Sequence, residues 1–166
     1  MLILSASAST AELDEYRAKS VFLYKFATFV EWPADTLKPG TEPVTICVLG
    51  QSALEQTLSA TVKDKQIDGR GFVVRPVADA KQASGCHLLF VTGAGMKRFR
   101  TARNDWKALT GVLVVGESDG FASEGGVINF KLSDGRLRLE VNLAEARRGR
   151  LVINSRLLGM ADVVER

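Results

Sequence analysis

The sequence has few of the residues from which catalytic and metal sites are usually built. Its 166 residues include one histidine and two cysteines. A Ser-His-Asp or Cys-His arrangement would have to use the one histidine, His87, which begins an apolar segment typical of a buried strand. No cluster of histidine, cysteine and acidic residues has metal-ligand spacing, and no pair of carboxylates stands out. The sequence therefore predicts a protein that is not an enzyme and that uses no metal or cofactor.

Long apolar runs and internal repeats are also missing. Beyond the start of the chain, no stretch is long and apolar enough to span a bilayer, and no motif recurs at a fixed period. Hydrophobic residues make up 46% of the chain and charged residues 25%, which is ordinary globular composition. The length suits one domain, which we place at residues 12–166.

The start of the chain differs from the rest. Met1 to Leu4 are apolar, and Ser5 to Ala8 have the small-x-small form of a signal-peptidase site. The basic n-region is missing and the apolar stretch is short. We interpret residues 1–11 as the residual part of a secretory signal, the alternative being a disordered start or a cloning remnant.

Positive charge is modest and does not define a nucleic-acid binder. The net charge is +3, and Lys and Arg gather at residues 97–107 and 147–150. The first cluster lies on one side of an amphipathic helical pattern, which indicates a solvated helix face. We expect no nucleic-acid partner, whereas a weak electrostatic attraction for an acidic partner remains an alternative.

The two cysteines leave two interpretations open. In an exported chain, Cys47 and Cys86 can form one disulfide bond. In a cytosolic protein, both would more often be small buried hydrophobic residues. Their spacing fits neither a Cys-x-x-Cys redox motif nor a zinc site.

Apolar segments alternate with helical patterns along most of the chain. Helical periodicity predicts three helices. The first spans residues 12–30, the second follows a Ser52/Glu55 capping box, and the third spans about 96–109. Continuous apolar segments predict buried strands, at 44–49, 72–77, 87–92 and 112–115. This alternation favours a three-layer α/β/α domain with a mainly parallel sheet.

The pattern changes after Gly126. Residues 128–132 and 137–141 alternate apolar with polar side chains around a Ser-Asp-Gly turn, which predicts an antiparallel hairpin at the end of the sheet. A short helix over 143–148 and a last helix over about 157–164 complete the chain. The polar side of the hairpin is either solvated or presented to a partner, and it carries Asn129, Lys131, Arg138, Glu140 and Asn142.

A Gly93-Ala94-Gly95 turn follows the third predicted strand. A turn between a strand and a helix is where a phosphate can bind. However, Arg98 stands where a dinucleotide fingerprint has its third glycine, so a tight turn explains the glycines as well. A small-molecule site at this edge of the sheet is the basis of our alternative functional hypothesis.

Two parts of the sequence resemble the YfiR family of periplasmic repressors. The first part is Lys19 to Phe26, continuing through Phe29 to Pro33. The second comprises Ile128 to Phe130, Arg138 to Leu143 and Leu151 to Leu158. The Phe-Val-Glu-Trp-Pro element combined with the C-terminal pattern is fairly specific, and the similarity spans nearly the whole chain after the leader.

The resemblance implies a periplasmic negative regulator. Such a protein binds and inhibits the periplasmic sensor domain of an inner-membrane diguanylate cyclase, which lowers cyclic di-GMP signalling and biofilm formation. An outer-membrane lipoprotein antagonist and a homodimer are implied as well. The alternative is a small-molecule-binding periplasmic module without a cyclase partner.

The resemblance also assigns residues. It places partner binding at Ile128, Glu140 and Ala146, of which Glu140 lies on the polar side of the predicted hairpin. Cys47 and Cys86 match positions where the family can carry a disulfide. A second cysteine pair, found around the hairpin in some members, is missing, so we expect a looser loop before the hairpin and no redox control by that pair.

Overall fold

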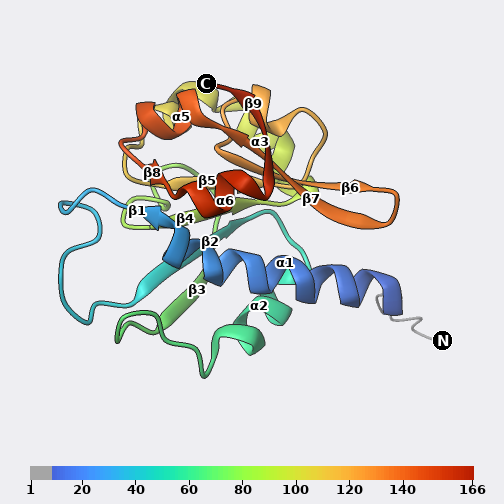
Figure 1. Cartoon of the computed structure of the whole chain (residues 1–166), viewed down its shortest axis with the longest axis horizontal. Helices are drawn as coiled ribbons and strands as arrows, with labels where there is room; N and C mark the ends of the chain where they lie inside the picture. The colour runs from blue at the N-terminus through green and yellow to red at the C-terminus, as the bar shows by residue number, and fades with distance from the viewer. Residues whose placement is uncertain (1–8) are drawn as a thin grey trace.

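A seven-stranded sheet forms the centre of the computed structural model, which describes residues 9–166 (Figure 1). The strand order is β3-β2-β4-β5-β6-β7-β9, and neighbours run parallel except for the antiparallel pair β6 and β7. The strands are β2 (Val44–Leu49), β3 (Phe72–Val77), β4 (Leu88–Val91), β5 (Leu113–Gly116), β6 (Ile128–Ser133), β7 (Arg136–Asn142) and β9 (Ala161–Glu165). A separate antiparallel pair joins β1 (Val30–Glu31) to β8 (Val152–Ile153).

Helices lie on both faces of the sheet, as the sequence predicts. They are α1 (Thr10–Phe29), α2 (Leu54–Val62), α3 (Met96–Thr101), α4 (Arg103–Lys107), α5 (Leu143–Arg148) and α6 (Ser155–Gly159). Short 3-10 turns occupy η1 (Gly93–Gly95) and η2 (Phe121–Ser123). Of the predicted leader, residues 1–8 lie outside the described part, and α1 begins at Thr10 with the Ser9 hydroxyl accepting a bond from the Glu12 amide.

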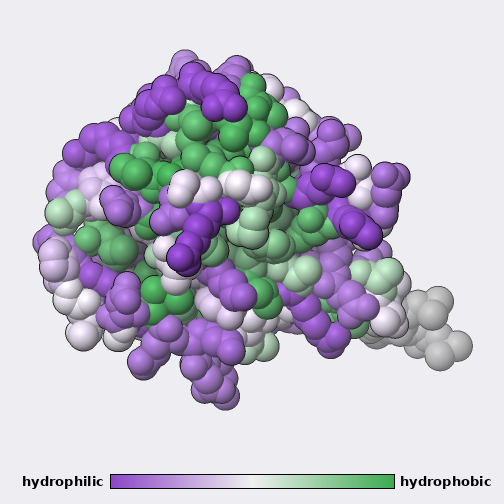
Figure 2. Space-filling model, in the orientation of Figure 1, coloured by the Kyte–Doolittle hydropathy of each residue, from purple (hydrophilic) through white to green (hydrophobic). Residues whose placement is uncertain are grey.

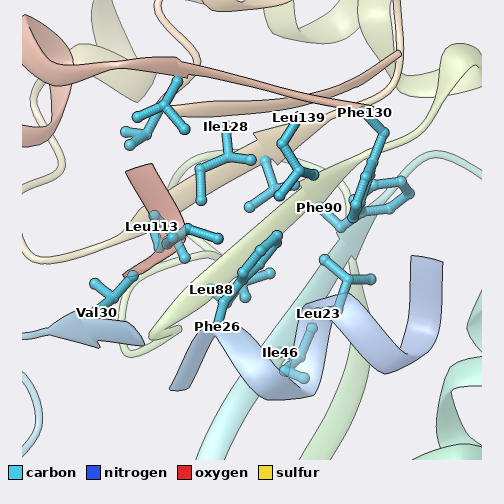
Figure 3. Close-up of a cluster of buried hydrophobic side chains, with 14 of the residues drawn as sticks. Leu23, Phe26, Val30, Ile46, Leu88, Phe90, Leu113, Ile128, Phe130 and Leu139 are labelled. Carbon is cyan, nitrogen blue, oxygen red and sulfur yellow. The ribbon is translucent and has the colours of Figure 1, made fainter. Parts of the chain in front are cut away.

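Two hydrophobic clusters fill the space between the sheet and its helices. Because successive strand residues point to opposite faces, the central strands β2, β4 and β5 contribute to both clusters. One cluster joins α1, through Leu23 and Phe26, to side chains of β2, β4, β5, β6 and β7 (Figure 3). Phe26 and Phe130 stack there with ring centroids 6.0 Å apart. The other cluster joins α3 and α4, through Phe99 and Trp106, to the opposite face.

The C-terminal segment is a strand, not the helix that its apolar spacing predicts. Helix α6 ends at Gly159, and Ala161–Glu165 pairs in parallel with β7. The free edge of β7 offers backbone partners, and the valines of this segment favour a strand. The sheet therefore ends at β9 rather than at the hairpin.

Two helix predictions also need correction. The helix predicted over 96–109 is divided at Ala102, although its stripe still buries Met96, Phe99 and Trp106 as expected. The capping box is wrong in register, because the N-cap of α2 is Ala53. Ser52 instead accepts a hydrogen bond from the Leu54 amide through its hydroxyl, at 3.1 Å.

Within residues 9–166, none of the helices combines the length and apolar character that a membrane crossing requires.

Candidate partner-binding site

The hairpin forms as predicted and sets the register of the candidate site. Asp134 (φ 52°) and Gly135 (φ 73°) both adopt the left-handed region, as a two-residue type I′ turn requires. Glycine and aspartate tolerate this conformation better than most residues. The register places Asn129 opposite Glu140 and Lys131 opposite Arg138.

The three residues assigned to partner binding differ in exposure. Ile128, labelled in Figure 3, is 0% exposed and Ala146 is 1% exposed, and both belong to the cluster beneath α1. Glu140 is half-buried and reaches the surface. A partner can therefore touch Glu140 directly, whereas Ile128 and Ala146 support the hairpin and α5 from below.

Two asparagines on the polar side of the hairpin are buried, not solvated. The Asn129 amide nitrogen donates to the Ser118 carbonyl (2.9 Å) and to Glu140 Oε1 (3.2 Å). The Asn142 amide nitrogen donates to the Ala122 carbonyl (2.7 Å) and to Glu165 Oε2 (2.7 Å). The segment between β5 and β6 therefore covers part of this face, which strand alternation alone cannot reveal.

The loop over residues 117–126 is fastened by more than these amides. Phe121 is fully buried, and a Cβ added at Gly116 or Gly126 would lie 2.4 or 2.2 Å from its ring. Both positions therefore require glycine for close packing. A loose loop is predicted here because a second cysteine pair is missing. The loop is instead held by the Phe121 ring and by the side-chain amides of Asn129 and Asn142.

A buried lysine ties α1 to the same loop. Lys19 is 5% exposed, and its Nζ donates to Glu15 Oε1 (2.5 Å) and Glu117 Oε2 (2.8 Å). Glu117 Oε1 also accepts a bond from the Gly93 amide (3.0 Å). Burial lowers the pKa of Lys19, but the two carboxylates outweigh it and the pKa is raised. Nothing in the sequence pattern separates Lys19 from an ordinary surface lysine.

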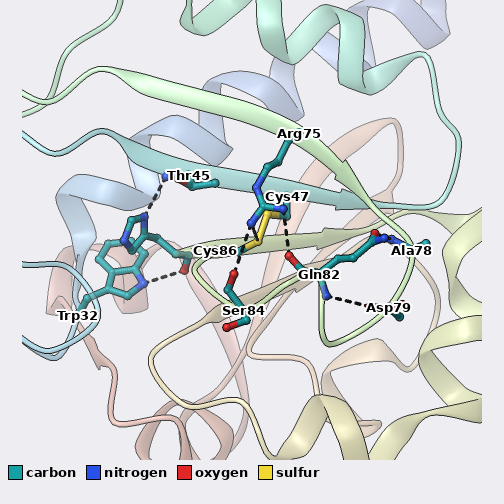
Figure 4. The surroundings of a disulfide bond; sticks show 10 residues. Trp32, Thr45, Cys47, Arg75, Ala78, Asp79, Gln82, Ser84 and Cys86 are labelled. Atoms are coloured by element: carbon teal, nitrogen blue, oxygen red, sulfur yellow. Dashed lines mark hydrogen bonds between the residues drawn. A yellow bond between two sulfur atoms is a disulfide. The ribbon is translucent and has the colours of Figure 1, made fainter.

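The cysteines are joined in a buried disulfide between β2 and the segment before β4 (Figure 4). The Cα atoms of Cys47 and Cys86 lie 6.0 Å apart, and the two residues are 0% and 3% exposed. The Arg75 guanidinium lies over the bond, 3.5 Å from Cys86 Sγ, and donates to the Gln82 carbonyl (3.0 Å). Of the two interpretations of the cysteines, the structure favours the bond, which fits an oxidising compartment.

His87 is a structural residue in the rim of the sheet, as its position in the sequence predicts. Its Nδ1 accepts from the Thr45 amide (2.9 Å), so its Nε2 carries the proton and donates to the Thr36 carbonyl (2.9 Å). Its own carbonyl accepts from Trp32 Nε1 (2.8 Å; Figure 4). Burial lowers the pKa of His87, and the opposing effects of Thr36 and Glu42 do not offset it.

This geometry predicts a pH effect on stability. The pKa of His87 is lower in the folded than in the unfolded chain, so its contribution is complete at neutral pH and is lost as the pH falls below about 6.5. We expect the change in urea midpoint between pH 7.5 and pH 5 to be smaller in His87→Gln than in the wild type. An equal change in both proteins would contradict this role.

Gly95 of η1 and Gly50, which follows β2, allow close packing between the β2 and β4 ends. A Cβ at Gly95 would lie 2.2 Å from the Leu49 carbonyl oxygen, and one at Gly50 would lie 2.2 Å from Thr92 Oγ1. The space at the carboxyl ends of β2 and β4, where α/β proteins often bind ligands, is therefore filled by backbone. A cavity of about 320 Å³ lies next to it, lined by residues that include Gln51, Glu55 and Arg98.

No group of three or more histidine, cysteine and acidic side chains is arranged for a metal ion in the part of the chain that the structure describes. The notable feature of the described residues is instead exposed hydrophobic surface. Among residues 9–166, six large hydrophobic side chains are exposed, and three of them follow residue 150, namely Val152, Met160 and Val164. Figure 2 shows hydrophobic surface in this C-terminal region, with hydrophilic side chains around it.

The fold is an α/β domain with a mostly parallel sheet that ends in a hairpin and an edge strand. Two solved structures share the fold at 12% identity. A conserved domain protein from Vibrio cholerae O1 biovar El Tor has a TM-score of 0.52, over 94% of this chain and 60% of that chain. The ABC domain from Streptococcus pneumoniae in complex with L-Trp has a TM-score of 0.50, over 73% and 55%. This chain therefore spans little more than half of either protein.

The chain belongs to the YfiR/HmsC-like family, whose model matches residues 16–162. The family is periplasmic and regulatory rather than catalytic, and it is linked to diguanylate cyclase signalling. The resemblance inferred from the two sequence stretches is thus confirmed. Among curated proteins, none gives a significant match.

Proposed function

We propose that this protein is a periplasmic negative regulator that binds the periplasmic sensor domain of an inner-membrane diguanylate cyclase. The observation that carries the proposal is the family match over residues 16–162, which includes α1 from Tyr16 onward and the whole hairpin. The buried disulfide supports an extracytoplasmic location. Inhibition lowers cyclic di-GMP and with it biofilm formation, and the protein itself catalyses no reaction.

The mechanism we propose is a population shift. A regulator that binds the inactive form of the sensor domain more tightly than the active form lowers cyclase output without any chemistry. The contact is made on the polar side of the hairpin through Glu140, while Ile128 and Ala146 hold the strands and α5 in place from the core. An outer-membrane lipoprotein that sequesters the regulator, and a homodimer as the binding unit, complete the proposal.

We expect the mature protein to capture the purified sensor domain of a membrane-bound cyclase from the same genome, and Glu140→Lys to weaken capture at least tenfold. A charge reversal within an interface costs affinity because the partner group is then repelled. Asp64→Lys is the matched control, since Asp64 is an exposed carboxylate beyond α2, far along the chain from the hairpin.

The same proposal predicts that a strain without this protein has raised cyclic di-GMP. Unchanged cyclic di-GMP in that strain, together with no capture by a folded wild-type protein, would reject the regulator function.

The second candidate is a small-molecule-binding module. It is favoured by the cavity of about 320 Å³ at the carboxyl ends of β2 and β3, where Glu55 and Arg98 bring opposite charges to an apolar wall of Val48 and Pro76. The fold neighbour from Streptococcus pneumoniae was solved with L-Trp, which makes amino acids reasonable first probes. A thermal-shift screen separates the candidates, because strong stabilisation by a ligand is expected only of the module.

A further inference from the structure

A row of oxygen acceptors crosses the last three strands of the sheet. The strand registers place Asn129 of β6 beside Glu140 of β7, and Glu140 beside Asp162 of β9. Residues paired in this way point to the same face of the sheet. Asn129 lies beneath the 117–126 loop, Glu140 is half-buried at its margin, and Asp162 is exposed. We call Asn129, Glu140 and Asp162 the acceptor row.

The carboxylates of the acceptor row have no cation. Within residues 9–166, neither Glu140 nor Asp162 takes part in an ion pair. The polar contact of Glu140 is the Asn129 amide nitrogen at 3.2 Å. Like charges on neighbouring strands are destabilising when they lie side by side. The row therefore places two negative charges on neighbouring strands without a cation among the described residues.

The Asn129 side chain provides a second, independent observation. Its Oδ1 is buried and has no hydrogen-bond partner, while the nitrogen of the same amide contacts Glu140. A buried acceptor without a donor is uncommon and costs free energy. The amide cannot be turned over to satisfy it, because Oδ1 would then face the Glu140 carboxylate. Asn129 Oδ1 and Asp162 thus lack donors among the described residues, and the donor that Glu140 accepts from is the Asn129 amide of the same row.

The next row along the hairpin has the opposite charge. Lys131 and Arg138 face each other two residues nearer the turn, and both are exposed. They lie on the same side of the hairpin as Glu140 but form no ion pair with it among the described residues. Adjacent rows of opposite sign fix the register of a charged partner more than they add affinity.

We infer that the acceptor row receives an arginine side chain of the cyclase sensor domain, an inference that rests on the proposed function. A guanidinium presents five N–H donors in a planar fork and stays charged at all physiological pH values. It can bridge Glu140 and Asp162, reduce their combined charge from two negative charges to one, and offer a donor toward the amide of Asn129. The basic Lys131/Arg138 row excludes a second cation and orients the arginine toward β9.

The test is to measure the affinity of the sensor domain for Glu140→Gln, Asp162→Asn and the double variant by titration calorimetry. We expect at least a tenfold loss for each single variant and less than the product for the double variant, because both carboxylates contact one group. The affinity of the wild type falls as salt is raised, and that of the double variant falls much less. Asp134→Asn is the matched control. It removes one charge at the tip of the same hairpin, and asparagine tolerates the left-handed conformation of that residue.

The outcomes separate the two proposals. If the folded wild-type protein does not bind the sensor domain, the proposed function fails and this inference fails with it. If the wild type binds but Glu140→Gln and Asp162→Asn remain within twofold of it, the function stands and the arginine site is wrong. Both variants should keep the wild-type urea midpoint or raise it, since each removes a like-charge neighbour, so a folding defect cannot account for weaker binding.

Discussion

We expect the double substitution Cys47→Ala/Cys86→Ala to lower the free energy of unfolding by about 4 kcal/mol. The bond joins residues 39 positions apart in the chain, so it removes much of the freedom of the unfolded state. Both residues are buried, so the substitution also removes packing within the cluster around Phe99. Urea unfolding followed by circular dichroism measures the change.

The control for this prediction is the wild-type protein unfolded in the presence of a reducing agent. Its midpoint should approach that of the double variant, because urea exposes the bond that the fold protects. Equal midpoints for the oxidised wild type and the double variant would show that the bond adds no stability.

Lys19→Met is expected to cost about 2 to 3 kcal/mol, less than a fully buried pair would because Glu15 and Glu117 keep some contact with water. The loss arises because the substitution leaves two carboxylates without their cation in a largely buried site. The pKa of Lys19 is raised, so its contribution is complete below the pKa of an unfolded lysine, about 10.4, and declines only above it.

Two further variants show whether this explanation holds. Lys25→Met changes an exposed lysine on the same helix and should leave the urea midpoint nearly unchanged. Adding Glu15→Gln and Glu117→Gln to Lys19→Met should recover most of the loss, because no charge then remains unpaired. A triple variant as unstable as Lys19→Met would assign the loss to packing instead.

The sequence predicts most of the sheet because the burial of strand residues produces recognisable patterns of apolar residues along the chain. The four apolar strands and the hairpin are found where their patterns place them. The segment around Val163 was harder to assign, because apolar residues that suit a helix face also suit an edge strand. Its state depends on the free edge of β7, where Val141, the partner of Val163, lies 22 residues away and outside any local window.

The candidate site is less predictable than the fold. The polar alternation of the hairpin identifies Glu140 as outward-facing, and the structure places it at the surface. The same alternation treats Asn129 as a solvated residue, whereas the 117–126 loop covers it. Lys19 likewise becomes distinctive only when folding brings Glu117 to it from 98 residues away. Contacts of this range leave no trace in local periodicity.

The position of β9 has a consequence for how the proposed binding surface forms during folding. Of the three strands that hold Asn129, Glu140 and Asp162, β9 is the last along the chain, and helices α5 and α6 separate it from β7. The hairpin can form from neighbouring residues, but the surface acquires its second carboxylate only when residues 161–165 have emerged and docked. Exported chains should therefore fold much of their core before they are competent to recognise a partner, so that recognition follows the docking of this last strand.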